Sequence, residues 1–412
     1  MKNILIIPPF NPYPLISGGH QAIFNGIAIL KGVANVYVYV ETTESKYKRG
    51  EDRLFEQALP FVHVLANIDP SSRHTIKWYW KVLMNKLRGA LGIKEAKKQV
   101  VNPILGIEPI CELSDLKVEF ILNSIKRYHI DIVQVEMMPD IKLVNYLPKE
   151  VETIFVQHEI KFVRDGLLLQ TMEHVTEEMQ TMYAQNKKEE IELHNKYDHV
   201  ITLSPIDTQK LIESGVSTPI TTSLAIVSSS SNQSSNETSV RKVLSFVGPE
   251  SHYPNYDGII WFLDNCWPLL QAKDPEYIFQ IIGMWSEQTS TEFAAKYYNK
   301  VKCVGFVEDL GETIAGTTMI VPLNIGSGIR MKILEAAQLR VPVVSTTVGA
   351  EGLPLKNGED IIIADTPDDF VEAICRLEDT LLVERLVNNM QQTVLSKFSL
   401  QALRDNRRSL YL

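Results

Sequence analysis

The sequence predicts an α/β protein that contains two similar domains, each built on a parallel sheet. Short apolar runs typical of buried strands alternate with longer helix-like stretches through the first half of the chain. The same alternation starts again after a polar stretch rich in Ser and Asn. Because ligands of such folds bind where parallel strands end, we expect the functional site in a cleft between the two domains.

The 412 residues are enough for two domains of ordinary size. We place an N-terminal domain at 1–225, a linker at 226–240 and a C-terminal domain at 241–385. Residues 228–237 carry no apolar side chain, which is typical of a flexible connection. Residues 386–412 form a C-terminal helical segment, for which a return to the N-terminal domain is one arrangement.

The N-terminal half begins with a buried strand, Ile4–Ile7, and a proline-rich loop. Ser17-Gly-Gly then opens a helix that extends to about Leu30, because Ser favours the N-cap position. A long helical pattern covers Ile160–Asn195. The other apolar runs are expected strands: Val36–Val40, Val62–Leu65, Ile132–Val135, Thr153–Gln157 and His199–Leu203.

The C-terminal half repeats this order. A strand at Val243–Val247 and a loop at Gly248 precede a helix from about Asn255 to Leu270. A final helical stretch begins at Thr380. The intervening runs are expected strands: Tyr277–Ile282, Val301–Val304, Met319–Leu323, Val341–Ser345 and Ile361–Ala364.

Composition narrows the class of protein. A net charge of −9 argues against a general nucleic-acid binder, which is usually basic. The four cysteines form no CxxC pair, so no metal site is implied. The N-terminal apolar run is too short for a signal peptide, and no run approaches the ~18 apolar residues that span a bilayer. We expect a cytoplasmic protein.

The most informative stretch runs from Gly326 to Ala337, between two predicted strands. Glycines at 326 and 328 allow the backbone to approach a ligand closely. Arg330 and Lys332 fall in the first turn of the following helix, where the helix dipole disfavours positive charge. Two cations in that position indicate that an anion binds there, and a phosphate-bearing ligand is the simplest one.

Other strand ends carry side chains or loops that suit ligand binding. A carboxylate such as Glu335 can accept two ribose hydroxyls, although a solvated helix glutamate is the alternative. Gly18 and Gly19 start a helix whose amides could hold a phosphate, or they form a capped turn. His158 follows a strand and could bind a sugar hydroxyl or move a proton; a structural histidine is the alternative.

Three further features leave both interpretations open. Arg164 is either a partner for an anion or a surface charge. The loop Gly349-Ala-Glu-Gly either brings amides to a ligand or is a simple turn. Residues 73–98 combine many basic and aromatic side chains with a single acid, Glu95. This segment either lies on an anionic membrane surface or packs on the domain with its lysines in water.

These residues resemble a known family. The matching stretches are Phe246-Val-Gly, Val304-Gly-Phe-Val-Glu-Asp-Leu, Pro322 through Ala337, Pro342 through Leu353 and, in the N-terminal half, Ser17-Gly-Gly and Gln157-His-Glu. The chain is similar to retaining glycosyltransferases of family 4, the group 1 glycosyl transferases. The resemblance implies the GT-B fold, in which two Rossmann-like domains face a central cleft. Residues 41–130 have no match.

The resemblance implies a nucleotide-diphosphate-sugar donor, with UDP or GDP as the nucleotide, bound mainly by the C-terminal domain. It implies no metal and no other cofactor. Glu335 would bind the ribose, His158 the transferred sugar, and Arg330 with Lys332 the departing diphosphate. These four are the expected catalytic residues. The expected donor-binding residues are Gly18, Gly19, Gly248, Phe306, Val307, Gly326, Ser327, Gly328, Leu334, Gly349 and Glu351.

The chain departs from the family pattern at two places. The family's usual pair of glutamates would occupy positions 327 and 335, but the first is Ser327. An Arg and a Lys often follow the Val-Gly strand end, where this chain has Pro249 and Pro254. Neutralising the diphosphate therefore depends more heavily on Arg330 and Lys332.

The resulting expectation is a retaining glycosyltransferase that acts on a saccharide or lipid-linked saccharide in cell-surface polysaccharide synthesis, with peripheral contact at the inner membrane face. One alternative is a nucleotide-sugar epimerase of the same architecture. Another is a non-catalytic binding protein or partner subunit that kept the fold, for which Ser327 is the best argument.

Overall fold

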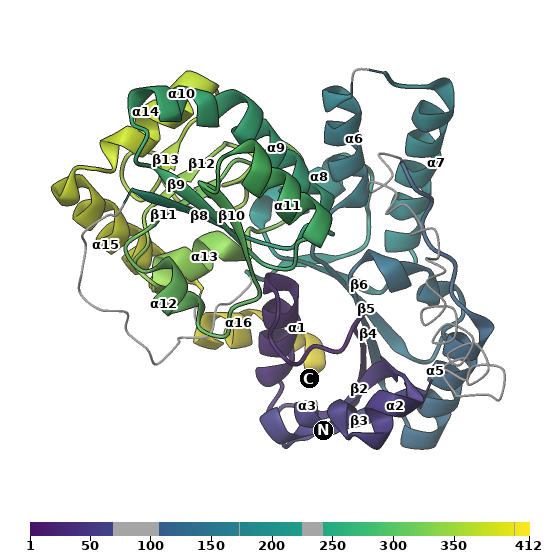
Figure 1. The fold of residues 1–412 in the computed structure, drawn as a ribbon. Coiled ribbons are helices and arrows are strands. Elements are labelled where there is room, and N and C mark those ends of the chain that lie inside the picture. Colours follow the sequence, from purple (N-terminus) through teal and green to yellow (C-terminus); the bar gives the residue numbers. More distant parts are fainter. Residues whose placement is uncertain (69–106, 173, 225–241, 399) are drawn as a thin grey trace, which may run out of the picture.

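A computed structural model describes residues 1–68, 107–172, 174–224, 242–398 and 400–412. Within these ranges the chain forms two α/β domains that lie side by side, each with one parallel sheet and helices on both faces (Figure 1). The predicted fold class is therefore confirmed. The predicted linker at 226–240 and the basic segment at 73–98 lie outside the described residues.

The N-terminal sheet has seven parallel strands in the order β3-β2-β1-β4-β5-β6-β7. Its strands are β1 (Asn3–Ile7), β2 (Asn35–Thr42), β3 (Val62–Ile68), β4 (Ile132–Glu136), β5 (Glu152–Gln157), β6 (His199–Thr202) and β7 (Ile220–Thr222). Its described helices are α1 (Gly18–Ala28), α2 (Glu44–Lys48), α3 (Leu54–Ala58), α5 (Asp115–Tyr128), α6 (Lys161–Thr171), α7 (Glu177–His194) and α8 (Pro205–Glu213), with 3-10 turns at η1 (Glu51–Arg53) and η3 (Met138–Asn145).

The C-terminal sheet has six parallel strands in the order β10-β9-β8-β11-β12-β13. They are β8 (Val243–Val247), β9 (Ile278–Ile282), β10 (Val301–Gly305), β11 (Thr318–Val321), β12 (Val343–Ser345) and β13 (Ile362–Ile363). The helices are α9 (Tyr253–Trp261), the π-helical turn η4 (Phe262–Cys266), α10 (Trp267–Lys273), α11 (Glu287–Lys296), α12 (Leu310–Ile314), α13 (Met331–Gln338), α14 (Pro367–Arg376) and α15 (Thr380–Lys397).

Both sheets follow the strand order of doubly wound nucleotide-binding folds. In each sheet, the first three strands extend from the central strand toward one edge, and the later strands extend from it toward the other edge. The order therefore reverses between β1 and β4 in one domain and between β8 and β11 in the other. Ligands of such sheets bind at the carboxyl ends of strands beside this reversal, so the loops after β1, β4, β8 and β11 are the expected site.

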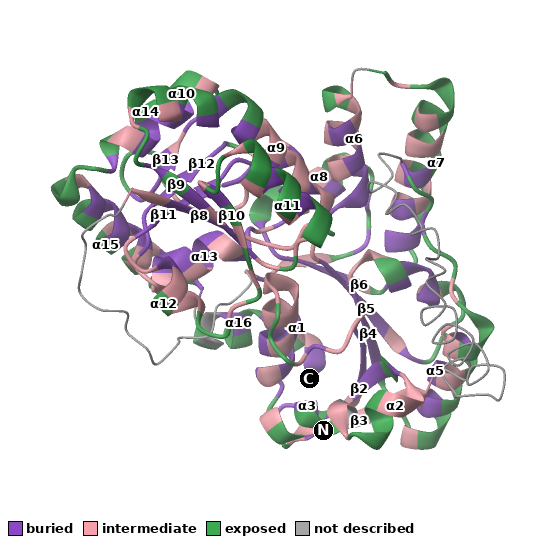
Figure 2. Ribbon diagram, in the orientation of Figure 1, coloured by how far each residue is buried: buried purple, intermediate pink, exposed green. Residues whose placement is uncertain are grey.

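The central strands are buried on both faces because helices cover both sides of each sheet (Figure 2). Ile4, Ile6 and Ile7 of β1 are fully buried, as are Met319, Ile320 and Val321 of β11. Runs of this kind contain continuous apolar residues rather than an alternating pattern, which is why the sequence shows them clearly.

Three elements differ from the sequence expectation. The helical pattern at Ile160–Asn195 is two helices, α6 and α7, because the chain leaves helical geometry at Met172, which caps α6 in an extended conformation. The helix expected from Asn255 to Leu270 is interrupted by the π-helical turn η4. The short strand β7 was not predicted, since its three residues give too little periodicity.

The C-terminal segment lies against the N-terminal domain. After α15, the chain forms α16 (Leu400–Arg407) and the turn η5 (Arg408–Tyr411), and the C-terminus lies beside α1 (Figure 1). The buried Arg407 donates from Nε to Ser223 Oγ at 2.8 Å. Tyr411 donates its hydroxyl to Gln134 Oε1 of β4 at 2.6 Å. The last helix thus connects the two domains a second time.

None of the helices in the described ranges is both long and apolar enough to cross a bilayer.

Candidate active site

Two loops from different domains meet directly. The loop after β5 carries His158, and the loop after β11 carries Ser327 and Gly328. A methyl group at Gly328 would lie 2.0 Å from the carbonyl oxygen of His158, and Gly328 also has a φ of +77°. Only glycine fits both the left-handed backbone and the close contact. The predicted close approach at this glycine is therefore to protein backbone.

Ser327 holds the same two loops together. Its Oγ accepts a hydrogen bond from the amide of Ile160 at 2.6 Å and donates to the Ile160 carbonyl at 3.2 Å. Ser327 is almost fully buried. The residue that replaces the family's usual glutamate thus contacts the neighbouring domain, and its short side chain is what allows this contact.

The first turns of two helices also converge at this interface. A methyl group at Gly18, the first residue of α1, would lie 2.5 Å from Cβ of Met331, the first residue of α13. One turn later, Gln21 donates from Nε2 to Glu335 Oε1. The positive ends of two helix dipoles therefore lie together, which favours an anion at this point.

Arg330 is buried at the N-cap position of α13. Its Nη1 donates to the carbonyl oxygens of Ser327 and Gly328. Its Nε and Nη2 are buried and have no hydrogen-bond partner within the described part of the chain. Each buried donor left without an acceptor costs about 1–3 kcal/mol, so an acceptor placed beside Nε or Nη2 would stabilise this site.

Lys332 reaches from α13 to the start of α9 and to strand β8. Its Nζ donates to Asn255 Oδ1 at 2.9 Å and lies 3.8 Å from the ring centroid of Phe246. Burial and the nearby Arg330 lower the pKa of Lys332 well below its ordinary value. The ammonium therefore occupies the region flanked by Pro249 and Pro254, where the family often places its own cations. It would gain from a nearby negative charge.

Glu335 is only partly exposed, and burial raises its pKa to about 7 although Gln21 and Lys332 both act to lower it. A carboxyl group with this pKa exists in both protonation states near neutral pH. The sequence placed Glu335 correctly on the helix that follows the glycine loop. It could not show that Gln21, from the other domain, contacts the carboxylate.

His158 is held by a carboxylate of the neighbouring strand. Its Nε2 lies 2.7 Å from Glu136 Oε2, and Glu136 is the last residue of β4. The side chains of both residues are at least nine-tenths buried. The arrangement of an imidazole fixed by a buried carboxylate is suited to orienting a ring that contacts a substrate.

Glu159 forms an ionic cluster at the same interface. Its Oε2 accepts from Arg164 Nη1 at 3.1 Å, and His252 of the other domain lies 3.8 Å from Oε1. Burial raises the pKa of Glu159, but His252, Arg164 and Arg330 together lower it to about 2. Arg164 also binds Asp165, so it belongs to a partly buried network and is not a simple surface charge.

Helix α7 contacts the residues on both sides of the His158 loop. Glu190 accepts hydrogen bonds from the amides of Lys161 and Phe162, the first two residues of α6. His194 Nε2 contacts Gln157 Oε1 at 2.7 Å. Burial raises the pKa of Glu190 to about 8 and lowers that of His194 to about 4. These groups fix the start of α6 and hence the loop before it.

The remaining predicted donor-binding residues differ in their exposure. Gly19, Gly248 and Gly326 lie in loops or at a helix start around the interface. Phe306 and Val307 follow β10, and the Phe306 ring is exposed. Leu334 is fully buried in the core, so its side chain has no access to a ligand.

The loop Gly349-Ala-Glu-Gly makes contacts of its own. The Gly349 amide already donates to Thr346 Oγ1 at 2.9 Å. Glu351 accepts from Lys210 of α8 at 2.6 Å, which adds a further interdomain contact. This loop holds the domains together in the present arrangement.

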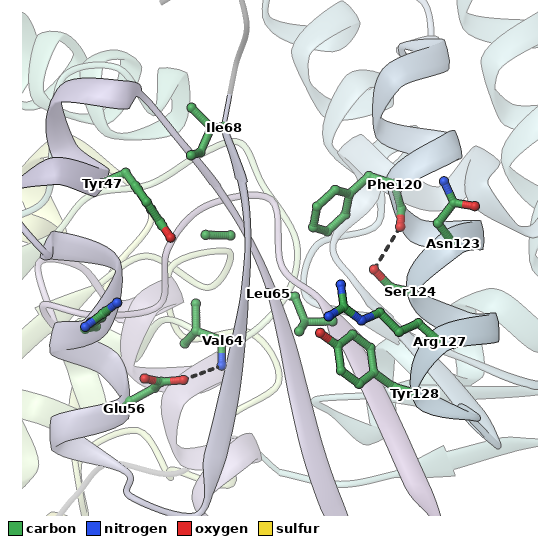
Figure 3. A pocket seen from close by; sticks show the side chains of 12 residues that line it. Tyr47, Glu56, Val64, Leu65, Ile68, Phe120, Asn123, Ser124, Arg127 and Tyr128 are labelled. Carbon is green, nitrogen blue, oxygen red and sulfur yellow. Dashed lines mark hydrogen bonds between the residues drawn. The ribbon is translucent and has the colours of Figure 1, made fainter.

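A separate cavity of about 600 Å³ lies at the edge strand β3 of the N-terminal sheet, away from these loops (Figure 3). Tyr47 and Glu56 line one side of the strand, and Phe120, Arg127 and Tyr128 line the other. None of the predicted site residues contributes to this cavity.

Several residues of the site were missed from the sequence, namely Gln21, Glu136, Glu159, Asn255 and Tyr411. Each acts through a partner that is distant in the chain, such as the 314 positions between Gln21 and Glu335. Only Glu159, directly after His158, and Glu136, at a strand end, carried a local signal.

Comparison with known proteins now identifies the C-terminal domain. Residues 241–380 match the family described as Glycosyl transferases group 1. This domain is a group 1 glycosyl transferase domain. The match includes Arg330, Lys332 and Glu335, whereas His158 and Gln21 lie outside it.

Two relatives match part of the chain. An uncharacterized 44.6 kDa protein in the cps region of Klebsiella pneumoniae is 29% identical over 136 residues, 31% of this chain and 35% of that protein. Glycosyltransferase 1 domain-containing protein 1 of Xenopus tropicalis is 26% identical over 165 residues, 35% of this chain and 48% of that protein. The chain thus spans less than half the length of either relative.

Solved structures resemble the whole chain. TarM has a TM-score of 0.70 at 11% identity, over 100% of this chain and 99% of TarM. Sucrose-phosphate synthase from Thermosynechococcus elongatus has a TM-score of 0.70 at 13% identity, over 100% and 98%. HepE from Anabaena, in complex with UDP and glucose, has a TM-score of 0.65 at 13% identity, over 98% of both chains. The fold is GT-B.

Replacing Gly328 by Ala tests the contact between the two loops. A methyl group there would collide with the His158 carbonyl in addition to straining the backbone, so we expect Gly328→Ala to lower stability and separate the domains. Gly358→Ala is the matched control, because Gly358 has a similar φ of +75° and open space around it.

Chemical unfolding and small-angle scattering provide the readouts. The control should lose only the ~1–2 kcal/mol of a left-handed alanine, and Gly328→Ala at least twice that together with a larger radius of gyration. Equal losses in the two variants, with unchanged scattering, would contradict the contact.

The raised pKa of Glu335 predicts a pH-dependent stability. The folded-state pKa is about 7 against an ordinary 4.5, so the contribution of the neutral carboxyl is complete below pH 4.5 and is lost as pH rises through 7. Glu335→Gln removes this titration. We therefore compare the Tm of the variant with the Tm of the unaltered protein. As pH rises from 4.5 to 8, this difference should change by about 3 °C or more in favour of the variant. Parallel Tm curves would rule out the shifted carboxyl.

Proposed function

We propose that the chain is a retaining glycosyltransferase of family 4, which transfers a sugar from a UDP- or GDP-sugar to a saccharide or lipid-linked saccharide. In this reaction the bond between the anomeric carbon and the diphosphate oxygen breaks. The nucleoside diphosphate leaves with the bonding electron pair, and an acceptor hydroxyl forms the new bond and gives its proton to the departing diphosphate. Support comes from the family of the C-terminal domain, the GT-B fold and the geometry of the interface.

The observation that carries this proposal is the incompletely hydrogen-bonded guanidinium of Arg330. Two of its donors are buried without an acceptor among the residues that the structure describes, at a point where the helices α1 and α13 both begin. A diphosphate supplies the missing acceptors and negative charge together. Because these atoms are covered in the present arrangement, we infer that the donor enters when the two domains separate and that the site closes around it.

The same charges suit the chemistry of the transfer. Negative charge on the diphosphate grows as the glycosidic bond to it breaks, so preorganised cations stabilise the transition state more than the ground state. Arg330 and Lys332 are fixed by hydrogen bonds to the Ser327 carbonyl and to Asn255, and so need little reorganisation during the reaction.

The other contacts are assigned by position. Glu335 would exchange Gln21 for the ribose hydroxyls when the donor binds. The exposed Phe306 and its neighbour Val307 would contact the base, and Gly18 with Gly19 would approach the phosphates. His158, held by Glu136, would bind the transferred sugar. A TarM variant and HepE have been solved in complex with UDP, which makes a UDP-sugar the first donor to test.

We further propose that the acceptor belongs to cell-surface polysaccharide synthesis and that the protein works in the cytoplasm, with peripheral contact at the inner membrane face. The contact is assigned to residues 73–98. Its test is co-sedimentation with vesicles of an anionic phospholipid, which should weaken with added salt. Equal binding to neutral vesicles would exclude an electrostatic contact.

Thermal shift with a panel of nucleotide sugars is the direct test of the donor. A bound donor raises the Tm by mass action, and the same nucleotide sugar should then be hydrolysed slowly in the absence of an acceptor. NMR of the released sugar would identify the anomer. We expect the anomeric configuration of the donor to be retained. A released sugar that has inverted would overturn the retaining assignment.

The alternatives give different results in the same assay. An epimerase converts one nucleotide sugar into another without an acceptor, whereas a transferase releases the nucleotide. A non-catalytic binding protein shows a thermal shift and no release. Ser327 no longer favours that last alternative, because its hydroxyl has a structural partner in Ile160.

Removing either cation should slow turnover. We expect Arg330→Ala and Lys332→Ala each to lower kcat by ~10²-fold or more, the scale for one preorganised charge contact. Arg340→Ala is the control, since Arg340 follows the other end of α13 and binds Asn388. Its activity should stay within about twofold. Near-normal turnover in both site variants would refute the diphosphate assignment.

A further inference from the structure

A chain of buried hydrogen bonds connects His158 to the end of the polypeptide. Tyr411 contacts Gln134, Gln134 contacts Glu136, and Glu136 contacts His158. The three distances are 2.6, 2.6 and 2.7 Å. Gln134, Glu136 and Tyr411 are each no more than 1% exposed, so water does not compete for these bonds. We refer to these four side chains as the His158 relay.

With Glu136 as a carboxylate, the donors and acceptors in the relay can be arranged in only one way. The Glu136 carboxylate accepts and cannot donate, so Gln134 must present its NH₂ group to Glu136 Oε1. The amide oxygen of Gln134 then faces Tyr411, and the phenol must be the donor. At its other oxygen, Glu136 again accepts, which places the proton of His158 on Nε2.

Each hydrogen bond therefore restricts the next side chain to a single arrangement. Tyr411 stops the Gln134 amide from flipping, Gln134 occupies one Glu136 oxygen, and the other oxygen fixes the imidazole tautomer. Burial raises the pKa of Tyr411 to about 12, which keeps its phenol protonated as this order requires. With Nε2 protonated, Nδ1 of the neutral ring is left as an acceptor for a hydroxyl group.

We propose that Tyr411 is a positioning residue for His158: by holding the Gln134 amide in one orientation it fixes the Glu136 carboxylate, and with it the orientation of the imidazole ring. The role in catalysis rests on the proposed function, because it assumes that His158 contacts the transferred sugar. The ring orientation does not, and it can be observed without any donor.

The first experiment is ¹⁵N NMR of the full-length protein labelled at histidine, with the His158 signal assigned from a His158→Gln spectrum. We expect the neutral ring of the unaltered protein to show protonation at Nε2. Tyr411→Phe removes only the hydroxyl, and Gln134→Met breaks the relay with a side chain of similar length. In both variants Glu136 still accepts from Nε2, so the tautomer should be kept, but the His158 signals should shift or broaden because the carboxylate is no longer held in one orientation. Unchanged signals in both variants would overturn the proposal.

The second experiment compares kinetics, once a donor is known. Tyr411→Phe should lower kcat by about 5–10-fold, the scale of one hydrogen bond, with the KM for the nucleotide sugar within twofold. Glu136→Gln should cost ~10²-fold or more, because it removes the group that selects the tautomer. A rise in KM with unchanged kcat would instead indicate a structural role.

Arg404→Gln is the matched control. Arg404 lies on the same C-terminal helix and anchors it through the Lys31 carbonyl, but it has no contact with the relay. This variant should keep the His158 signals and the turnover of the unaltered protein. If it changed both as Tyr411→Phe does, general loosening of the helix would explain the effect and the proposal would fail. If no donor is ever found but the His158 signals change as expected, only the proposed function fails.

Discussion

The contact between the loops at 158–160 and 326–330 is the interaction on which the rest of the site depends. It brings a strand end of one sheet against a strand end of the other, with Gly328 on the His158 carbonyl and Ser327 on Ile160. Because the backbones of the two loops touch each other, their relative position has little freedom. The locations of His158 and Arg330 are therefore set together, although they belong to different domains.

The same contact creates an electrostatic imbalance. The closed arrangement brings together the starts of α1 and α13, the Arg330 guanidinium and the Lys332 ammonium. Glu159 offsets part of this charge, which is why its pKa falls to about 2 despite burial. Two Arg330 donors still have no acceptor in the described ranges of the chain. A protein that closes around a bound anion would show this pattern, because the ligand then supplies part of the force that holds the domains together.

Much of the fold was predictable because parallel strands covered on both faces give continuous apolar runs. The strands at Val243–Val247 and Ile132–Val135 were placed to within a residue. The cations of the Gly326–Ala337 stretch were also recognisable, since a glycine loop followed by two basic residues is a local pattern. The break between α6 and α7 was missed because the apolar spacing on either side of Met172 is compatible with one helix.

The partners of those residues were not predictable in the same way. Gln21, Asn255 and Tyr411 have ordinary side chains in ordinary local sequences, and only the fold brings them to Glu335, Lys332 and Gln134. Ser327 was interpreted as a missing acid, whereas it joins the domains. A single sequence records which chemistry is present at a strand end, but hydrogen bonds between distant segments require the topology.

The return of the final helix has a consequence for biosynthesis. The ribosome produces Tyr411 after every other member of the hydrogen-bonded chain, so Glu136 can already contact residue 158 while the Gln134 amide is still free to flip. That amide is held only once residue 411 has been made and contacts β4. A nascent polypeptide that has not reached residue 411 would thus lack one of the bonds that orient the imidazole.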